Sequence, residues 1–269
     1  MANIEQTPSI ISRAGSFINR LANPGRFMMF SGKVLPWLTV LTVLLFAYGL
    51  FLVFFRTPPD YQQGETVKIM FIHVPSAWLA MMGYTIIAIA SIGSLIWRHP
   101  LADVAVKAAL PIGASFTFLA LVTGSLWGKP MWGTFWVWDA RLTSVLVLFF
   151  FYIGLMALQQ AFDDSSKAGR ASAILALVGF VNIPIIKFSV DWWSTLHQPA
   201  SVLRAGGSTL HPQFLIPLLV MAVAFTCLFV VLHFHSMRNE ILRRRVQSLR
   251  LAQTRQSSIN QQTGDPHHV

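Results

Sequence analysis

The chain carries at residues 34–55 an apolar run without a charged side chain, VLPWLTVLTVLLFAYGLFLVFF. At about 1.5 Å of rise per residue, a helix of this length crosses the ~30 Å hydrocarbon core of a bilayer. Five further runs of comparable length and composition follow it, at residues 76–98, 108–127, 142–160, 171–190 and 213–234. The sequence therefore predicts an all-α integral membrane protein with six transmembrane helices.

The composition of the whole chain supports this prediction. Of its 269 residues, 54% are hydrophobic and only 11% are charged, whereas soluble domains average about 25% charged residues. The formal net charge is +10, but the basic residues lie in the tails and in short loops between apolar runs. That distribution is typical of membrane topology and not of a basic nucleic-acid-binding face, so we expect no nucleic-acid partner.

The distribution of the basic residues also orients the chain. Fourteen of the twenty lysines and arginines lie in the two tails and in the loops near 98–107 and 161–170. Positive residues stay in the cytoplasm, so both termini are predicted to be cytoplasmic and the bilayer itself is the first expected partner. The loops that follow the first, third and fifth runs then face outward.

Three parts are expected along the chain. Residues 1–33 form a cytoplasmic segment whose apolar residues between 10 and 21 share one helical face, as in a helix that lies on the membrane surface. Residues 34–236 form the six-span membrane domain, and residues 237–269 form a basic cytoplasmic tail.

The second outer loop, residues 127–141, reads WGKPMWGTFWVWDAR and is rich in tryptophan. Seven of the nine tryptophans fall on the outer side of the predicted topology, whereas an interfacial aromatic belt would populate both sides of the membrane. We therefore favour an aromatic shelf for a large, flat, apolar ligand over a belt. The shelf residues in this loop are Trp127, Trp132, Trp136 and Trp138.

Two histidines flank the tryptophan-rich loop, His73 in the first outer loop and His197 in the third. A lone loop histidine is usually solvated, but two neutral imidazoles at opposite edges of a flat apolar cavity are typical axial ligands of haem iron. We therefore predict His73 and His197 as the metal ligands. His211 lies on the same side and remains a competitor for the place of His197.

Charged residues near the loop could serve the haem propionates. Arg141 ends the tryptophan-rich loop and Lys68 lies five residues before His73. Arginine can clamp a carboxylate with two hydrogen bonds, and lysine acts as a point charge. The alternative for Arg141 is that it anchors a helix end at the headgroups. Asp139 is expected to be a structural acceptor for loop amides or a tryptophan N–H.

The stretch from Trp132 to Asp139, WGTFWVWD, resembles the WGxxWxWD signature of the haem-handling (WWD-domain) proteins. With the six spans, His73 and His197, the chain is similar over about residues 30–240 to the cytochrome c maturation protein C family, also called haem exporter protein C. The resemblance implies that His73 and His197 hold haem b and that Trp127 to Asp139 form its binding loop.

The same resemblance implies a set of partners and a location. Members of this family present haem to a membrane-tethered haem chaperone in the bacterial inner membrane, on its periplasmic side. They work beside a small single-span helper and the ATPase and permease subunits of an ABC transporter. The protein would then be a haem-transfer protein in cytochrome c biogenesis and not an enzyme.

Two other classes remain as alternatives. A b-type cytochrome that moves electrons usually places pairs of histidines within its spans, whereas both ligands are predicted here in loops on one face. A permease for a smaller amphipathic anion would need polar groups in the middle of its spans, and these spans contain almost none.

The predicted topology can be tested with reporter fusions. Fusions after residues 65, 134 and 205 should report an outer, periplasmic location, and fusions after residues 103, 166 and 245 a cytoplasmic one. A cytoplasmic reporter at residue 134 would contradict the outer location of the tryptophan-rich loop, and with it the single outer site.

Overall fold

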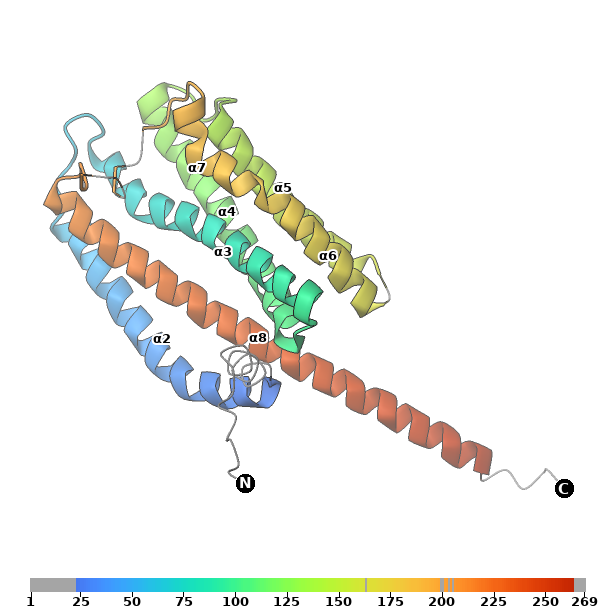
Figure 1. The fold of residues 1–269 in the computed structure, drawn as a ribbon. Helices are drawn as coiled ribbons and strands as arrows, with labels where there is room; N and C mark the ends of the chain where they lie inside the picture. Colours follow the sequence, from blue (N-terminus) through green and yellow to red (C-terminus); the bar gives the residue numbers. More distant parts are fainter. Residues whose placement is uncertain (1–22, 163, 199–200, 203, 205, 264–269) are drawn as a thin grey trace, which may run out of the picture.

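The computed structural model describes residues 23–263, apart from 163, 199–200, 203 and 205. Its elements are, in chain order, α2 (Pro24–Phe55), the 3₁₀ helix η1 (Glu65–Ile69), α3 (Met70–Trp97), α4 (Pro100–Trp132), α5 (Ala140–Gln160), α6 (Ser165–Phe180), α7 (Asn182–Trp192) and α8 (Pro212–Thr263). Figure 1 shows them as one bundle of antiparallel helices. Six helical segments are long and apolar enough to cross a membrane, with α6 and α7 together making the fifth, so the predicted fold class is confirmed.

The first helix begins about ten residues before the apolar run. Asn23 caps α2, because its side-chain oxygen accepts from the backbone N–H groups of Gly25 (2.8 Å) and Arg26 (3.4 Å). Pro24 follows at the first helical position, where a missing N–H costs nothing. Local capping, which hydropathy does not detect, therefore sets this end, and residues 24–33 belong to the first helix. The predicted amphipathic stretch, residues 10–21, lies outside the described residues.

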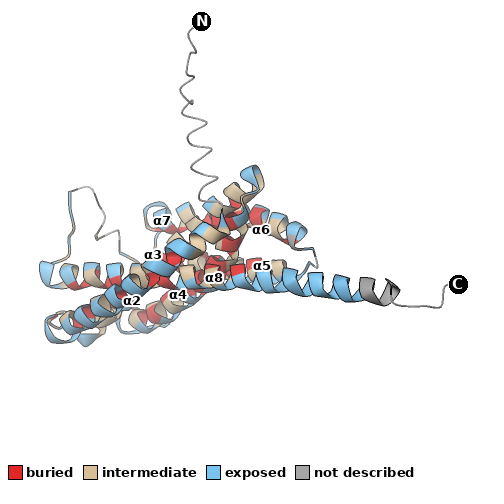
Figure 2. Cartoon of the chain, turned by 90° about the horizontal axis from the view of Figure 1, so that it is seen from below, coloured by how far each residue is buried: buried red, intermediate tan, exposed pale blue. Residues whose placement is uncertain are grey.

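The last helix is much longer than the predicted span at residues 213–234. Helix α8 continues without interruption to Thr263, so the basic tail expected from residue 237 is its extension as far as that residue. In Figure 1 this extension, orange to red, projects well beyond the other helices. In Figure 2 it is largely pale blue, that is, exposed. Residues 264–269 of the predicted tail lie outside the described residues.

Two ties fix α8 at the end of the bundle where α2 begins. Arg238 donates through Nη1 to the carbonyl of Met28 (2.7 Å) and to Ser31 Oγ (2.9 Å), which joins α8 to α2. Six residues further on, Arg244 pairs with Asp103 of α4 and donates through Nε to Glu240 (2.7 Å). The start of the extension is therefore anchored to both α2 and α4.

The fifth span is broken between α6 and α7. Pro184, early in α7, has no backbone N–H, and its ring clashes with the carbonyl four residues earlier in a regular helix. Asn182 lies buried at the break and donates through Nδ2 to the carbonyl of Ser144 in α5 (2.8 Å). A polar group in the bundle interior is thus satisfied by a neighbouring helix, and α7 is directed along α5 toward the outer end.

The centre of the bundle is packed around two tyrosines, Tyr84 of α3 and Tyr152 of α5, whose rings meet edge to face at 5.2 Å. Tyr152 donates through its hydroxyl to the carbonyl of Ala80 (2.8 Å). Its ring packs against Gly113 of α4 so closely that a Cβ at that position would overlap the ring. Gly113 is therefore required by close approach of a side chain and not by a turn.

Gly113→Ala should destabilise the bundle by about 1–3 kcal/mol, because overpacking a close-packed core forces side chains off their rotamers. The measurement is the thermal unfolding midpoint of the purified protein in detergent. Gly154→Ala in α5 is the matched control, because nothing lies within 4 Å of its added Cβ, and its midpoint should be unchanged or slightly higher. Equal midpoints for the two variants would contradict the packing of Tyr152.

Candidate functional site

The C-terminal end of α4 forms the centre of the candidate site. The tryptophan-rich stretch was expected to be a loop from residue 127 to 141, but α4 continues to Trp132 and only residues 133–139 are non-helical. The helix stops at Gly133, whose φ of 75° lies in the left-handed region that glycine adopts at little cost. Its carbonyl then accepts from Lys129 Nζ (2.8 Å). Trp127 and Trp132 are therefore held on a rigid helix end.

His73 lies in the first turn of α3 and not in the preceding loop, which corrects the expectation from sequence. Its Nδ1 is 3.1 Å from the carbonyl oxygen of Ala120 and 3.1 Å from Thr123 Oγ1, both on α4. A carbonyl oxygen can only accept, so Nδ1 carries the proton and Nε2 keeps its lone pair. Gly124 makes room for this ring, because a Cβ there would lie 2.8 Å from His73 Cε1.

Trp127 connects the first outer loop to His73. Its Nε1–H donates to Gln63 Oε1 (2.7 Å), and its ring meets the imidazole of His73 edge to face at 5.7 Å. The loop around Gln63 is itself ordered by Asp60, whose carboxylate accepts from the N–H groups of Gln62 and Gln63 (both 2.9 Å). Sequence reasoning missed Gln63, because a single glutamine in a polar loop carries no recognisable signal.

His197 lies in the connection between α7 and α8, and its Nδ1 is 3.2 Å from Asp139 Oδ2. The other carboxylate oxygen, Oδ1, accepts from the backbone N–H of Leu142 (2.7 Å) and so caps α5. Asp139 was expected to accept from loop amides or a tryptophan N–H, whereas the amide that it accepts from lies in the first turn of α5, and its contact with His197 was not foreseen. The ring of Trp132 packs against the imidazole at 4.9 Å.

The electrostatics favour the neutral form of His197. Burial lowers the pKa of its imidazole below the ordinary value, while the hydrogen bond to Asp139 opposes that shift without cancelling it. In the neutral ring, Nδ1–H donates to the carboxylate, which can only accept, so Nε2 is unprotonated. His73 and His197 therefore both present an Nε2 lone pair, which is the form that ligates a metal.

The end of α4 lies between the two imidazoles, since Trp127 contacts the ring of His73 and Trp132 contacts the ring of His197. Within the described residues, no cluster of three or more His, Cys, Asp or Glu side chains could hold a bare metal ion. A haem iron needs only two axial ligands from the protein, because the porphyrin supplies four. The donor set therefore fits haem better than a free ion.

Trp136 and Trp138 lie on the non-helical segment after Gly133. Their rings form an edge-to-face pair at 5.5 Å. The side chain of Trp138 is 75% exposed. Trp136 Nε1 is buried and has no hydrogen-bond partner among the described residues, which leaves a donor at the site.

The three remaining candidates have local partners. Arg141 donates through Nε to Ser189 Oγ (3.1 Å) and through Nη2 to the carbonyls of Ile186 and Lys187 in the middle of α7, so it joins α5 to α7. Lys68 pairs with Glu65 (2.7 Å) and lies over the ring of Phe54. His211 is exposed and its Nδ1 accepts from the N–H of Gln213 at the start of α8. Among the described residues, no hydrogen bond joins the side chain of His211 to α4.

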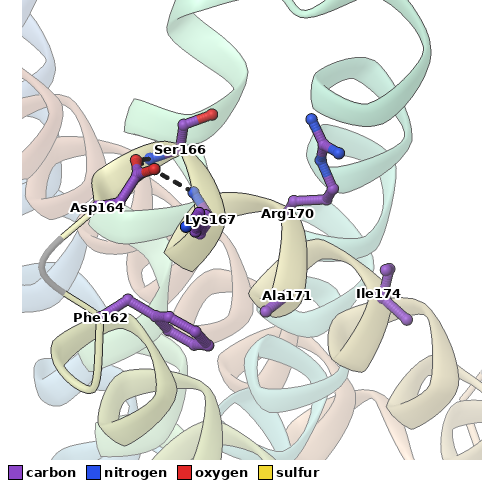
Figure 3. A pocket seen from close by; sticks show the side chains of 7 residues that line it. All are labelled: Phe162, Asp164, Ser166, Lys167, Arg170, Ala171 and Ile174. Carbon is purple, nitrogen blue, oxygen red and sulfur yellow. Dashed lines mark hydrogen bonds between the residues drawn. The ribbon is translucent and has the colours of Figure 1, made fainter.

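A hollow at the opposite end of the bundle is not part of this site. It lies at the turn between α5 and α6, and Figure 3 shows Asp164 there, accepting from backbone N–H groups at the start of α6. The hollow is lined by Phe162, Asp164, Ser166, Lys167, Arg170, Ala171 and Ile174.

The fold and the site together define a polytopic helical membrane protein with two imidazoles packed against tryptophan rings at one end. The chain belongs to the haem exporter protein C family, whose model matches residues 17–252. It is 66% identical to "Heme exporter protein C" of Bradyrhizobium diazoefficiens over 244 residues, 91% of this chain and 92% of the relative. It is 47% identical to the protein of that name in Escherichia coli K12 over 225 residues, 84% and 91% of the two chains. A putative cytochrome c biosynthesis ccmC-like mitochondrial protein of Marchantia polymorpha is 45% identical over 205 residues, 76% and 87%.

Removal of the Arg141 side chain should loosen the outer ends of α5 and α7. Arg141→Ala breaks the hydrogen bonds to Ser189 and to the α7 carbonyls. Loss of these charged hydrogen bonds should lower the free energy of unfolding of the haem-free protein by about 1–3 kcal/mol, and with it the thermal unfolding midpoint. Lys187→Ala is the control, because it removes a cation from an exposed position on α7. If both haem-free variants unfold like the unmodified protein, Arg141 does not fasten these helices.

Proposed function

We propose that this protein binds haem b at the outer face of the bacterial inner membrane and passes it to a haem chaperone during cytochrome c biogenesis. The observation that carries the proposal is the pair of neutral imidazoles, His73 and His197, whose Nδ1 atoms are engaged and whose Nε2 atoms are available. The names of the relatives, haem exporter protein C and a cytochrome c biosynthesis protein, support the same class of cargo.

The division of labour between the residues follows from their positions. Nε2 of His73 and Nε2 of His197 ligate the iron, and the rings of Trp127, Trp132, Trp136 and Trp138 provide apolar surface for the porphyrin. Gln63 and Asp139 act indirectly, since one orients Trp127 and the other orients His197. In this proposal the protein carries haem, and any covalent step takes place on the partner chaperone.

The propionates need hydrogen-bond donors or cations, and the two candidates, Lys68 and Arg141, differ in how strongly their present partners hold them. Lys68 is engaged by a single ion pair with Glu65, whose side chain is 65% exposed, and exposed pairs of this kind contribute little free energy. Lys68 can therefore exchange Glu65 for a propionate. Arg141 already donates to α7, so a propionate at Arg141 would share a guanidinium that also fastens the helix.

The expected partners are the haem chaperone, the ATPase and permease subunits of an ABC transporter, and a small single-span helper. Transfer to a membrane-tethered chaperone fits a site at the end of the bundle, where cargo is reached from the aqueous side. An electron-carrying b-type cytochrome is the second candidate, and the position of His73 within α3 favours it more than two loop histidines would. A b-type cytochrome with two haems stacked across the bilayer would need a pair of histidine ligands at each end of the bundle.

The ligands can be tested by replacing each histidine and restoring the imidazole from solution. In His73→Gly and in His197→Gly, haem should remain through the other ligand and the tryptophan shelf, with a five-coordinate absorption spectrum. Added imidazole should occupy the vacated side and restore the six-coordinate spectrum. His211→Gly is the control and should keep the original spectrum.

Two outcomes would contradict the assignment. If His211→Gly loses haem while His197→Gly keeps the original spectrum, the second ligand is His211. If all three variants keep it, the iron is not held by these histidines.

A further inference from the structure

The two imidazoles stand in unlike electrostatic surroundings, although each offers the same nitrogen to the cargo. The Nδ1–H of His197 points at the carboxylate of Asp139, at 3.2 Å. The Nδ1–H of His73 points at the carbonyl oxygen of Ala120 and at a hydroxyl, that of Thr123, both neutral acceptors. Thr123 Oγ1 donates its own hydrogen to the Leu119 carbonyl (2.6 Å), so it can only accept from the ring.

This difference changes the strength of the two ligands. A carboxylate behind an imidazole N–H shifts electron density toward the opposite nitrogen, which makes that nitrogen a stronger donor to a metal. A neutral carbonyl does the same to a smaller extent. The stronger donor also favours ferric over ferrous iron, because axial ligation and the hydrogen bonds behind it set the reduction potential.

The carboxylate of Asp139 is held so that it keeps this role. The residue is only 9% exposed, and its second oxygen is fixed by the Leu142 N–H at the start of α5. Among the described residues, His197 is the one ion-pair partner recorded for it within 4.0 Å, and no lysine or arginine competes at that distance. Its charge therefore acts on the imidazole of His197 at shorter range than on the guanidinium of Arg141, which it also stabilises.

The two histidines also differ in how the backbone that carries them is held, and this difference again makes His73 the ligand that separates from the cargo first. His73 belongs to α3 and its ring is enclosed by α4, where Gly124 and Trp127 leave it little space to follow a departing ligand. His197 lies outside any helix, between α7 and α8. Cargo that leaves the bundle therefore separates from a fixed His73, whereas the chain that carries His197 is not tied into a helix.

We infer that the site holds haem unequally, with the Asp139–His197 pair as the retained side and His73 as the ligand that leaves the iron first when haem is exchanged. This inference rests on the proposed haem ligation. It makes Asp139 a positioning residue that acts through His197, and it assigns an order to the two bonds that break during transfer.

The test compares haem retention in the full-length purified protein after excess apomyoglobin is added as a haem acceptor. His73→Gly, which keeps the Asp139–His197 side, should lose haem several-fold more slowly than His197→Gly. Asp139→Asn should speed the loss several-fold in the His73→Gly background and leave it unchanged in the His197→Gly background. In the otherwise unmodified protein, Asp139→Asn should also move the haem midpoint potential in the positive direction.

Matched variants separate this role from helix capping. Asparagine and serine both cap helices well, so Asp139→Asn and Asp139→Ser keep the start of α5 and remove the charge behind His197. Asp164→Asn makes the same change at the capping aspartate of α6, away from the site, and should change neither retention nor potential. Thr123→Val removes one neutral acceptor from His73 and should have a much smaller effect than Asp139→Asn.

The outcomes distinguish failure of the inferred order of ligand loss from failure of the proposed haem ligation. Equal or reversed retention in the two histidine variants, or an Asp139→Asn effect that persists in the His197→Gly background, would overturn the inference and leave haem ligation intact. Unchanged spectra and retention in both histidine variants would instead remove the proposed function on which the inference rests.

Discussion

The carboxylate of Asp139 joins the scaffold to the site, and the arrangement of the outer end depends on it. One oxygen accepts the Leu142 N–H that begins α5, and the other faces Nδ1 of His197. A helix start and a side chain more than fifty residues away are thus fixed by one buried anion. Because an unpaired buried charge is costly, the pair holds only while both partners are in place.

The membrane spans supply the rigidity that this arrangement needs. In lipid, backbone groups must be satisfied within the protein, so the elements are long helices, and even the break at Asn182 is satisfied by a carbonyl of α5. Helix α4 is 33 residues long and ends at Trp132, which places Trp127 and Trp132 on a rigid helix between the two histidines. The loops then contribute Gln63 and His197 to a surface that is already formed.

A carrier must bind its cargo firmly and also release it, and the proposed ligation would separate these demands between two sides. The His73 side is built from α3 and α4 and is fixed. The His197 side is carried by a connection between helices and is strengthened by charge. Such a division is not visible in the identities of the ligands, since both are histidines whose Nδ1 atoms face acceptors.

The sequence by itself determined the fold class, the six spans and the candidate ligands, because hydropathy and span parity depend on local composition. The uninterrupted apolar run at residues 34–55 requires a membrane helix in any tertiary context. Only the tertiary structure decided that Gln63 orients Trp127, that Arg141 fastens α7, and that Asp139 stands behind His197. These pairs are separated by 64, 48 and 58 positions, so no local pattern encodes them. They exist because packing of the helices brings their outer ends to one place.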